Sequence, residues 1–221
     1  MKYLNLIFVS ALLVLIVSCG PTTKVTGSWT KPDHQAATYK KVVVLGIAQN
    51  SVNRRIFEDQ VDTRLDALGY PVIPALDLLP PNAAIGTITR DIVLSIFESA
   101  NVDAVFTMSL RHKEDTRQYQ PGSTAYYVPY YTGMGFYDYY GGYAGYYYSP
   151  GYYTGSVQIF LEANFFDLNS GELIWSAQTK STDAGSIDKM AVDFADLVVA
   201  DFVKSGVLVP TNAPPDTKKK K

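Results

Sequence analysis

The residue whose chemistry stands out first is Cys19, because it is the single cysteine among 221 residues. No intramolecular disulfide can form, and a lone cysteine in a secreted protein is paired with another chain, free or modified. It follows Lys2 and an apolar run over 4–17 that only Asn5 and Ser10 interrupt. This run is too short and wrongly flanked for a transmembrane helix and is typical of the apolar core of a signal peptide. The thiol, which can be alkylated, therefore lies where a signal peptide would end.

The residues Ile16-Val17-Ser18-Cys19 resemble the lipobox of bacterial lipoproteins, in which an aliphatic, a tolerated and a small residue precede a cysteine. The resemblance implies a thioether-linked diacylglycerol on Cys19, cleavage between Ser18 and Cys19, and acylation of the new amino terminus, for example with palmitate. Two or more acyl chains hold a protein stably on a bilayer. The alternative is an uncleaved signal anchor with an incidental cysteine.

The residues after the cysteine bear on the destination of the protein. Gly20 follows Cys19, and no aspartate stands there. By its resemblance to Gram-negative sorting signals, this favours the outer membrane over retention in the inner membrane. No acidic cluster of the kind found in some surface-exported lipoproteins follows, so we expect the periplasmic face.

A second chemically unusual feature is a tyrosine- and glycine-rich segment over 119–155. It holds 14 of the 17 tyrosines of the chain, with eight glycines and three prolines. Tyrosine combines a flat apolar ring with a hydroxyl group, which suits it to interfaces. We therefore predict a contact surface for an envelope protein or a cell-wall polymer. The candidate contact residues are Tyr126, Tyr127, Tyr130, Tyr131, Tyr137, Tyr139, Tyr140, Tyr146, Tyr147 and Tyr148.

Other interpretations of this segment remain open. It could fold over its own domain, or be a low-complexity loop without a specific ligand. A nucleic-acid stacking platform would need basic residues, and none occurs between Gln118 and Gly155. A membrane-inserting hairpin would need lipid-facing and water-facing residues in strict alternation. Pro121, Pro129 and Pro150 interrupt such an alternation.

No catalytic or metal-binding pattern accompanies these features. His34 and His112 are far apart, and the run 112–115 (HKED) has no second cluster at ligand spacing. A nucleophile elbow of the G-x-S-x-G type is missing, as is a phosphate-binding glycine loop. We expect no metal, no cofactor and no enzymatic activity.

Hydrophobic periodicity predicts the elements that must carry these residues. Strands are expected over 25–30, 41–47, 70–73, 103–110, 156–166 and 172–180. Helices are expected over 52–68, from Thr87 or Thr89 to about Ala100, and over 186–204. The turn Asp167-Leu168-Asn169-Ser170-Gly171 predicts a hairpin between the last two strands.

The helical periodicity also assigns inward and outward faces. The predicted inward residues are Phe57, Val61, Leu65 and Leu68 in the first helix, Ile88, Ile92, Ile96 and Phe97 in the second, and Ile187, Met190, Ala191, Phe194, Val198 and Phe202 in the third. The predicted outward residues are Arg54, Arg55, Glu58, Asp59, Asp62 and Asp66 in the first helix, and Asp188, Asp193, Asp196 and Asp201 in the last.

This order of elements predicts an α/β (α+β) fold, with a mixed sheet of five to six strands and about three helices packed on it. The order, with the runs 29–32 (WTKP), 41–47 (KVVVLGI), 100–105 (ANVDAV) and 170–175 (SGELIW), resembles small envelope domains. Those include lipoproteins of domain-of-unknown-function families, the curli-secretion lipoprotein, activator lipoproteins of penicillin-binding proteins and the N-terminal domain of the Tol translocation protein. None of them supplies a catalytic residue that can be transferred.

We thus predict a signal peptide over 1–18, a lipidated tether over 19–24, one domain over 25–208 with the insertion 119–155, and a disordered tail over 209–221. The body from Gly20 to Pro215 has 14 basic and 20 acidic residues, which gives no electrostatic footprint for nucleic acid. The function expected is a lipid-anchored, non-enzymatic interaction module held to the bilayer through Cys19. The alternative is a self-assembling structural or secretion component that forms an oligomeric ring at the outer membrane.

Overall fold

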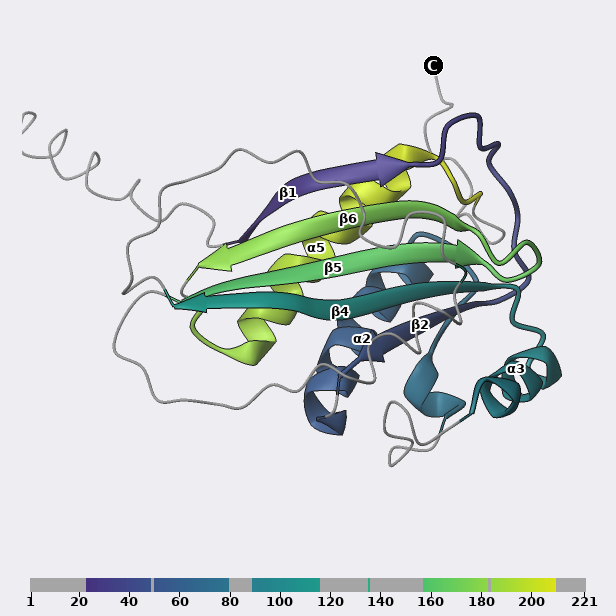
Figure 1. Ribbon diagram of the computed structural model, residues 1–221, viewed down its shortest axis with the longest axis horizontal. Coiled ribbons are helices and arrows are strands. Elements are labelled where there is room, and N and C mark those ends of the chain that lie inside the picture. Colours follow the sequence, from purple (N-terminus) through teal and green to yellow (C-terminus); the bar gives the residue numbers. More distant parts are fainter. Residues whose placement is uncertain are drawn as a thin grey trace, which may run out of the picture.

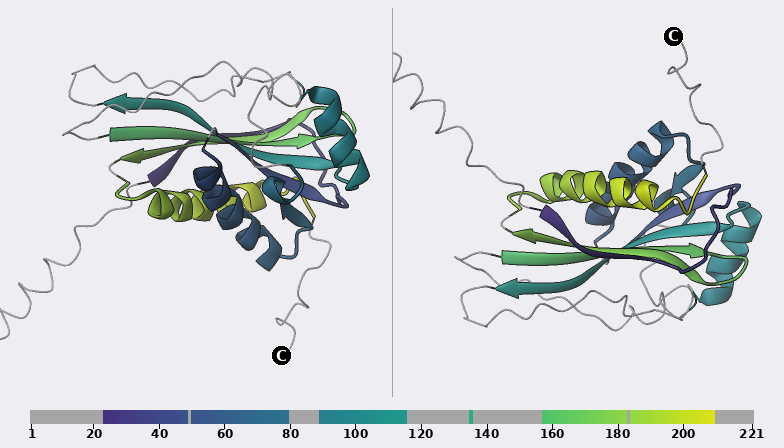
Figure 2. Two further views of the ribbon diagram at one scale, coloured as in Figure 1. Left: turned by 90° about the horizontal axis from the view of Figure 1, so that it is seen from below. Right: turned by 90° about the horizontal axis from the view of Figure 1, so that it is seen from above.

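A computed structural model describes residues 23–48, 50–79, 89–115, 135, 157–182 and 184–209. These residues form one six-stranded mixed sheet in the order β1-β6-β5-β4-β2-β3. Helices α2 and α5 pack on one face of the sheet, and α3 lies on the other face toward one end (Figures 1 and 2). The predicted mixed sheet with three helices is confirmed.

The elements follow the predicted boundaries closely. They are β1 (Thr23–Thr30), β2 (Val42–Ile47), α2 (Ser51–Ala67), β3 (Val72–Pro74), the 3-10 helix η1 (Ala75–Asp77), α3 (Arg90–Ser99), β4 (Ala104–Asp115), β5 (Val157–Asp167), β6 (Leu173–Thr182) and α5 (Ile187–Ser205). The main difference is in β4, which continues five residues beyond the predicted end at Leu110. Its polar second half pairs with β5 as far as Asp115 opposite Val157.

The sheet has a parallel part and an antiparallel part. Strand β2 runs parallel to both β3 and β4, whereas β4, β5, β6 and β1 are joined antiparallel. Val42 and Val44 of β2 belong to one core cluster, and Val43, Leu45 and Ile47 belong to another. Burial on both faces explains why this strand reads as a continuous apolar run.

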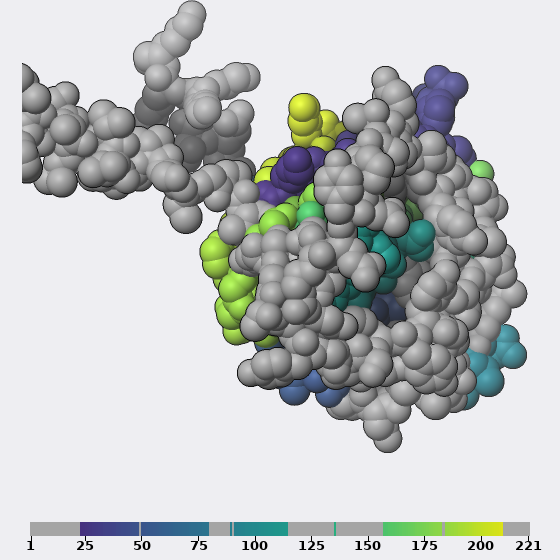
Figure 3. Space-filling view, turned by 60° about the vertical axis from the view of Figure 1, so that its left-hand side comes forward, coloured from purple at the N-terminus to yellow at the C-terminus, as the bar shows by residue number. Residues whose placement is uncertain are grey.

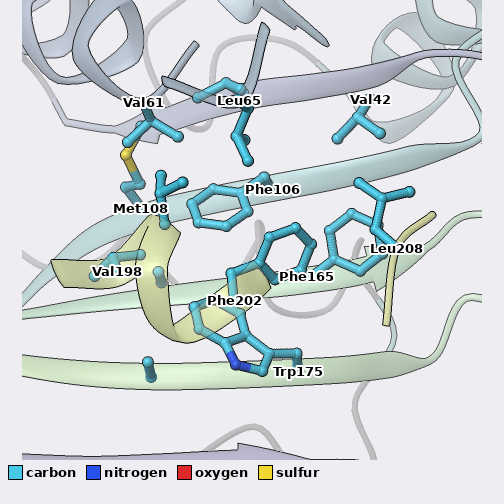
Figure 4. Close-up of a cluster of buried hydrophobic side chains, with 14 of the residues drawn as sticks. Val42, Val61, Leu65, Phe106, Met108, Phe165, Trp175, Val198, Phe202 and Leu208 are labelled. Carbon is cyan, nitrogen blue, oxygen red and sulfur yellow. The ribbon is translucent and has the colours of Figure 1, made fainter. Parts of the chain in front are cut away.

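The larger core lies between the sheet and helices α2 and α5. The Phe202 ring of α5 is 5.0 Å from the rings of Phe165 and Trp175 and 5.3 Å from the ring of Phe106, measured between centroids. Figure 4 shows these rings packed together below Val61 and Leu65 of α2. The predicted inward stripe of α5 is confirmed, because Met190, Ala191, Phe194, Val198 and Phe202 are buried and Ile187 packs against the same cluster.

Helix α3 covers a smaller core on the opposite face of the sheet. Val93 and Phe97 are buried there, and Ile96 packs against the same cluster. The prediction that Ile92 points inward is wrong, because its side chain is 49% exposed. Positions 93, 96 and 97 share one helical face, and Ile92 lies to the side of it. Ile88 lies outside the described residues.

The predicted β5–β6 hairpin is confirmed. Asp167 Oδ1 accepts hydrogen bonds from the backbone N–H groups of Asn169 at 2.7 Å and Ser170 at 3.3 Å. Gly171 has a φ of 73°, a conformation that glycine adopts at little cost. An aspartate that closes the turn and a glycine that completes it fix the register of the two strands.

Two charged residues of α2 predicted to face outward are buried. Arg54 is 6% exposed and Glu58 is completely buried, and their Nε and Oε1 atoms are 2.7 Å apart. The Glu58 carboxylate also accepts hydrogen bonds from the backbone N–H groups of Gly46 and Leu76, each at 2.9 Å. A Cβ at Gly46 would lie 3.0 Å from the Arg54 Cγ, so this glycine makes room for the arginine.

Burial raises the pKa of Glu58, while Arg54 and the backbone hydrogen bonds oppose that rise. Asp62 was also predicted to face outward but is partly buried. Its own burial and the neighbouring carboxylates of Asp66, Asp59 and Asp77 raise its pKa to about 6, against the opposing charge of Arg55. Arg55 and Asp59 face solvent as predicted.

One acidic residue of α5 also departs from the prediction. Asp201 is partly buried and accepts a hydrogen bond from Trp175 Nε1 at 3.2 Å. The indole N–H of a buried tryptophan needs an acceptor, and the helix turn beside Phe202 supplies one. The sequence assigned Asp201 to the outer face because it is charged.

The buried ion pair gives the first prediction. Replacing Arg54 with Met leaves the Glu58 carboxylate buried without its charged partner, so we expect the free energy of unfolding to fall by about 3 kcal/mol. The matched control is Arg55→Met, which removes the exposed ion pairs of Arg55 with Asp59 and Asp77. Exposed ion pairs contribute less than about 1 kcal/mol each, so this loss should be smaller. Urea denaturation of both variants measures the difference. Similar losses in the two variants would contradict a structural role for the buried pair.

Candidate functional site

The sheet face opposite α2 and α5 carries a row of polar side chains along β4, β5 and β6. In β4, Phe106 and Met108 enter the larger core, so the alternate residues Thr107 and Ser109 point to the other face. In β5, Ala163 and Phe165 enter the larger core, so Glu162 and Asn164 also point to the other face. The register places these polar residues beside one another across the strands.

We define the polar sheet face as Thr107, Ser109, Glu162, Asn164 and Ser176. Thr107 lies opposite Asn164, which in turn lies opposite Ser176, and Ser109 lies opposite Glu162. All five residues are at most 4% exposed. Of the described helices, α3 and the 3-10 helix η1 contribute to this face, and both pack on its apolar residues. Helix α3 lies toward one end of the sheet (Figure 2).

The centre of the polar sheet face is a short hydrogen-bonded network. Asn164 Nδ2 donates to Glu162 Oε1 at 2.8 Å. Arg111, which follows on β4, places its Nε 3.4 Å from Glu162 Oε2. Asn164 Oδ1 is buried and has no hydrogen-bond partner among the described residues. A buried carbonyl oxygen without a donor is costly, so this position calls for a donor from outside the described sheet.

Larger side chains border the polar sheet face where β4 and β5 approach Asp115 and Val157. The Lys180 Nζ lies 5.7 Å from the centre of the Phe160 ring, and the His112 ring is 6.0 Å from the same ring. Atoms of β4, drawn in teal, are visible at the molecular surface in Figure 3. His112 is exposed, and its Nε2 lies 3.3 Å from Glu114 Oε1.

This arrangement suits hydrogen bonding. It offers three hydroxyl groups, one carboxylate and one amide oxygen in adjacent positions on a rigid sheet. Within the part of the chain that the structure describes, no group of three His, Cys, Asp or Glu residues could hold a metal ion. Nor is any helix in that part long and apolar enough to cross a membrane.

The functional residues predicted from sequence lie outside the described residues. This holds for Ser18, Cys19 and all ten candidate tyrosines: Tyr126, Tyr127, Tyr130, Tyr131, Tyr137, Tyr139, Tyr140, Tyr146, Tyr147 and Tyr148. One residue of the segment 119–155, Gly135, is described. A Cβ built on it would lie 3.2 Å from the carbonyl oxygen of Gly171, so it adjoins the β5–β6 turn.

The polar sheet face was not predicted from the sequence, although a signal for it was present. Strand β4 alternates Phe106 and Met108 with Thr107 and Ser109, a period of two residues that indicates one apolar and one polar face. The prediction for 103–110 was a strongly apolar strand, and it did not distinguish the two faces. The burial of those hydroxyls has no sequence signal.

Comparison with known proteins identifies no family. No protein-family model matches the chain, and no curated protein matches it in sequence. Similar solved structures include a PelC dodecamer from Paraburkholderia phytofirmans, with 15% identity over 80% of this chain and 95% of that chain and a TM-score of 0.43. The lipoprotein GNA1162 from Neisseria meningitidis has 14% identity over 74% of this chain and 98% of that chain, with a TM-score of 0.35. These values describe a distant likeness, and no role is transferred from it.

The network on the polar sheet face gives the second prediction. Asn164→Asp replaces the amide donor with a carboxylate oxygen beside Glu162 Oε1, so two acids share a buried position. We expect the free energy of unfolding at neutral pH to fall by about 3 kcal/mol. The two carboxylates repel each other when both are ionised, so stability is retained at about pH 4 and is lost as the pH rises toward neutrality.

The matched control makes the same chemical change at an exposed helix cap. Asn50 accepts hydrogen bonds from the backbone N–H groups of Val52 and Asn53, and aspartate caps a helix equally well. Thermal unfolding from pH 4 to 8 should therefore show a strong pH dependence for Asn164→Asp and little change for Asn50→Asp. If the unfolding temperatures of the two variants depended on pH in the same way, the buried pair of acids would be excluded.

Proposed function

We propose that this protein is a lipid-anchored, non-enzymatic accessory protein of the bacterial envelope, facing the periplasm from the outer membrane. Its domain acts as an interaction module, and the segment 119–155 provides the contact surface for an envelope protein or a cell-wall polymer. The observation that carries the proposal is the run Ile16-Val17-Ser18-Cys19 with the first strand starting at Thr23. The modified residue and the folded domain are then only three residues apart.

This short tether sets the orientation of the domain. The four steps from Cys19 to Thr23 reach at most about 14 Å, so the start of β1 stays close to the bilayer. Thr23 pairs with Ser181, and the neighbouring strands bring Thr182, Val157 and Asp115 to the same end of the sheet. We call this end the anchor end. The segment 116–156 leaves and re-enters the sheet there, so anchor and contact segment share one end of the domain.

The absence of a catalytic pattern in the sequence supports a binding role. The described sheet contributes hydroxyl, amide and carboxylate groups that already serve one another, as in the bond from Asn164 to Glu162. Tyrosine rings in the segment add apolar area with few rotatable bonds, which favours association at a low entropic cost.

The anchor is tested at Cys19 itself. Cys19→Ser removes the thiol that would carry the diacylglycerol, and we expect the product, expressed behind a cleavable signal peptide, to be extracted in water without detergent. Ser18→Ala, which keeps a small residue before the cysteine, is the matched control and should remain with the membrane. Mass spectrometry of the wild-type protein should give an acylated amino-terminal peptide that begins at Cys19. An unmodified peptide that begins at Met1 would refute the lipid anchor.

The contact surface is tested by deleting 119–155. This change leaves four residues, 116–118 and 156, between Asp115 and Val157, which are already paired. Four residues are an ordinary length for a hairpin loop, so the sheet should form as before. We expect crosslinking in intact cells to recover its envelope partners at least about tenfold less efficiently, as on losing an interface hot spot.

Two further variants test whether binding depends on the tyrosine rings or only on the presence of the segment. Replacing the ten candidate tyrosines with serine keeps the segment and removes the rings, and it should lose the partner as the deletion does. Replacement by phenylalanine keeps the rings and should retain part of the binding. Unchanged partner recovery and unchanged cell-wall binding in the deletion variant would exclude the segment as the contact surface.

A further inference from the structure

The polar sheet face presents a contradiction that the described elements do not resolve. Its five side chains are buried, although α3 and η1 pack only on the apolar part of this face, and α2 and α5 lie on the opposite side. Asn164 Oδ1 is also buried without a hydrogen-bond partner. A covering element that brings hydrogen-bond donors would satisfy both observations.

The path of the chain points to one occupant. Residues 116–156 leave β4 at Asp115 and return to β5 at Val157, at the anchor end. Gly135, near the middle of this stretch, adjoins Gly171 in the β5–β6 turn, at the far end of the sheet. Strand β5 has 11 residues and is about 36 Å long. The chain must therefore travel the full length of the sheet before Gly135 and again after it.

Chain length permits this path along the sheet. The stretches 116–134 and 136–156 contain 19 and 21 residues, and each can span more than about 60 Å when extended. Each stretch therefore has nearly twice the length needed. Helices α2 and α5 occupy one face of the sheet, so the polar sheet face is the one left for the passing chain.

The chemistry of the segment matches that of the face. Between Gln118 and Gly155 the only charged residue is Asp138, whereas 14 residues are tyrosines. A tyrosine hydroxyl can donate to a carbonyl or carboxylate oxygen and accept from serine or threonine. Its ring meanwhile excludes water from the bond it makes. Asn164 Oδ1 and the Glu162 carboxylate are acceptors of this kind.

We propose that residues 116–156 dock along the polar sheet face of their own domain, with tyrosine hydroxyls donating hydrogen bonds to Asn164 and Glu162. The tyrosines that face the sheet hold the segment in place, and those on its other side form its outer surface. This inference goes beyond the proposed function, because intramolecular docking does not require an external partner. A failure to find a partner therefore leaves it unaffected.

The test measures how readily a thiol on the polar sheet face reacts. Ser176→Cys is introduced together with Cys19→Ser, in the full chain and in the chain that lacks 119–155. Ser28→Cys is the matched control, because Ser28 is exposed on the adjacent strand β1. We expect a charged disulfide reagent to modify Cys at position 176 at least about tenfold faster in the deletion variant, and position 28 equally fast in both chains.

Two outcomes would overturn the proposal. Fast modification at position 176 in the full chain would show that the segment does not cover the face. Slow modification in both chains would show that something other than the segment covers it, such as a second copy of the chain. Circular dichroism of each variant verifies that the sheet is intact.

An independent measurement avoids any substitution on the sheet. Hydrogen–deuterium exchange of the unmodified full chain should show amides of the segment exchanging at least about tenfold more slowly than in the free peptide 116–156. Asn164→Ala should then accelerate this exchange, and Asp188→Ala on the exposed face of α5 should not. Exchange in the full chain at the rate of the free peptide would refute the docking.

Discussion

The alternation of side chains along β4 and β5 is the constraint on which the structure depends. In each strand one set of residues, including Phe106 and Phe165, builds the core with α5, and the other set, including Thr107 and Asn164, forms the polar sheet face. Because successive residues of a strand point to opposite faces, a slip of one residue would exchange the two sets. The turn at Asp167 to Gly171 fixes the β5–β6 register and so protects this separation.

The same pairing explains how the domain tolerates a long insertion. Asp115 and Val157 are direct partners, so 41 residues form a loop whose two ends are held together by the sheet. The entropic cost of closing a loop rises only by about 0.6 kcal/mol for each doubling of its length. The hydrophobic core lies mainly on the face of α2 and α5, and its contacts do not involve the polar sheet face. A segment on that face can change in sequence without removing an apolar contact from the larger core.

The sequence predicted features that depend on periodicity and turn chemistry. The run Val42 to Ile47, the hairpin turn and the inward stripe of α5 were all predicted, because each is a local pattern with one physical solution. The errors at Arg54, Glu58 and Asp201 share one cause. Helical periodicity places charges outside, but Gly46 on a neighbouring strand opens space for Arg54, and Trp175 supplies a donor for Asp201. Such partners lie on other elements and become visible only when the elements are packed.

The candidate functional residues also fall into two groups, those predictable from local sequence and those that required the packed structure. Cys19 and the tyrosines were predicted from composition and a local motif, which require no packing information, and they lie outside the described residues. The polar sheet face needed the register of three strands, since Ser176 and Thr107 are 69 positions apart and meet through Asn164. Even so, alternation in β4 alone would have indicated a polar face.

The positions of the strand ends relate the proposed anchor to the proposed contact surface. With a lipid on Cys19, the three-residue tether holds Thr23 and the anchor end near the bilayer. Gly135 adjoins the opposite end of the sheet, about 36 Å along a strand of the length of β5. A segment that docks along the polar sheet face would therefore carry its outer tyrosines from the membrane surface outward into the periplasm. An unattached loop of the same length would have to lose far more conformational entropy to present those rings, so docking makes the proposed contact surface less costly to order.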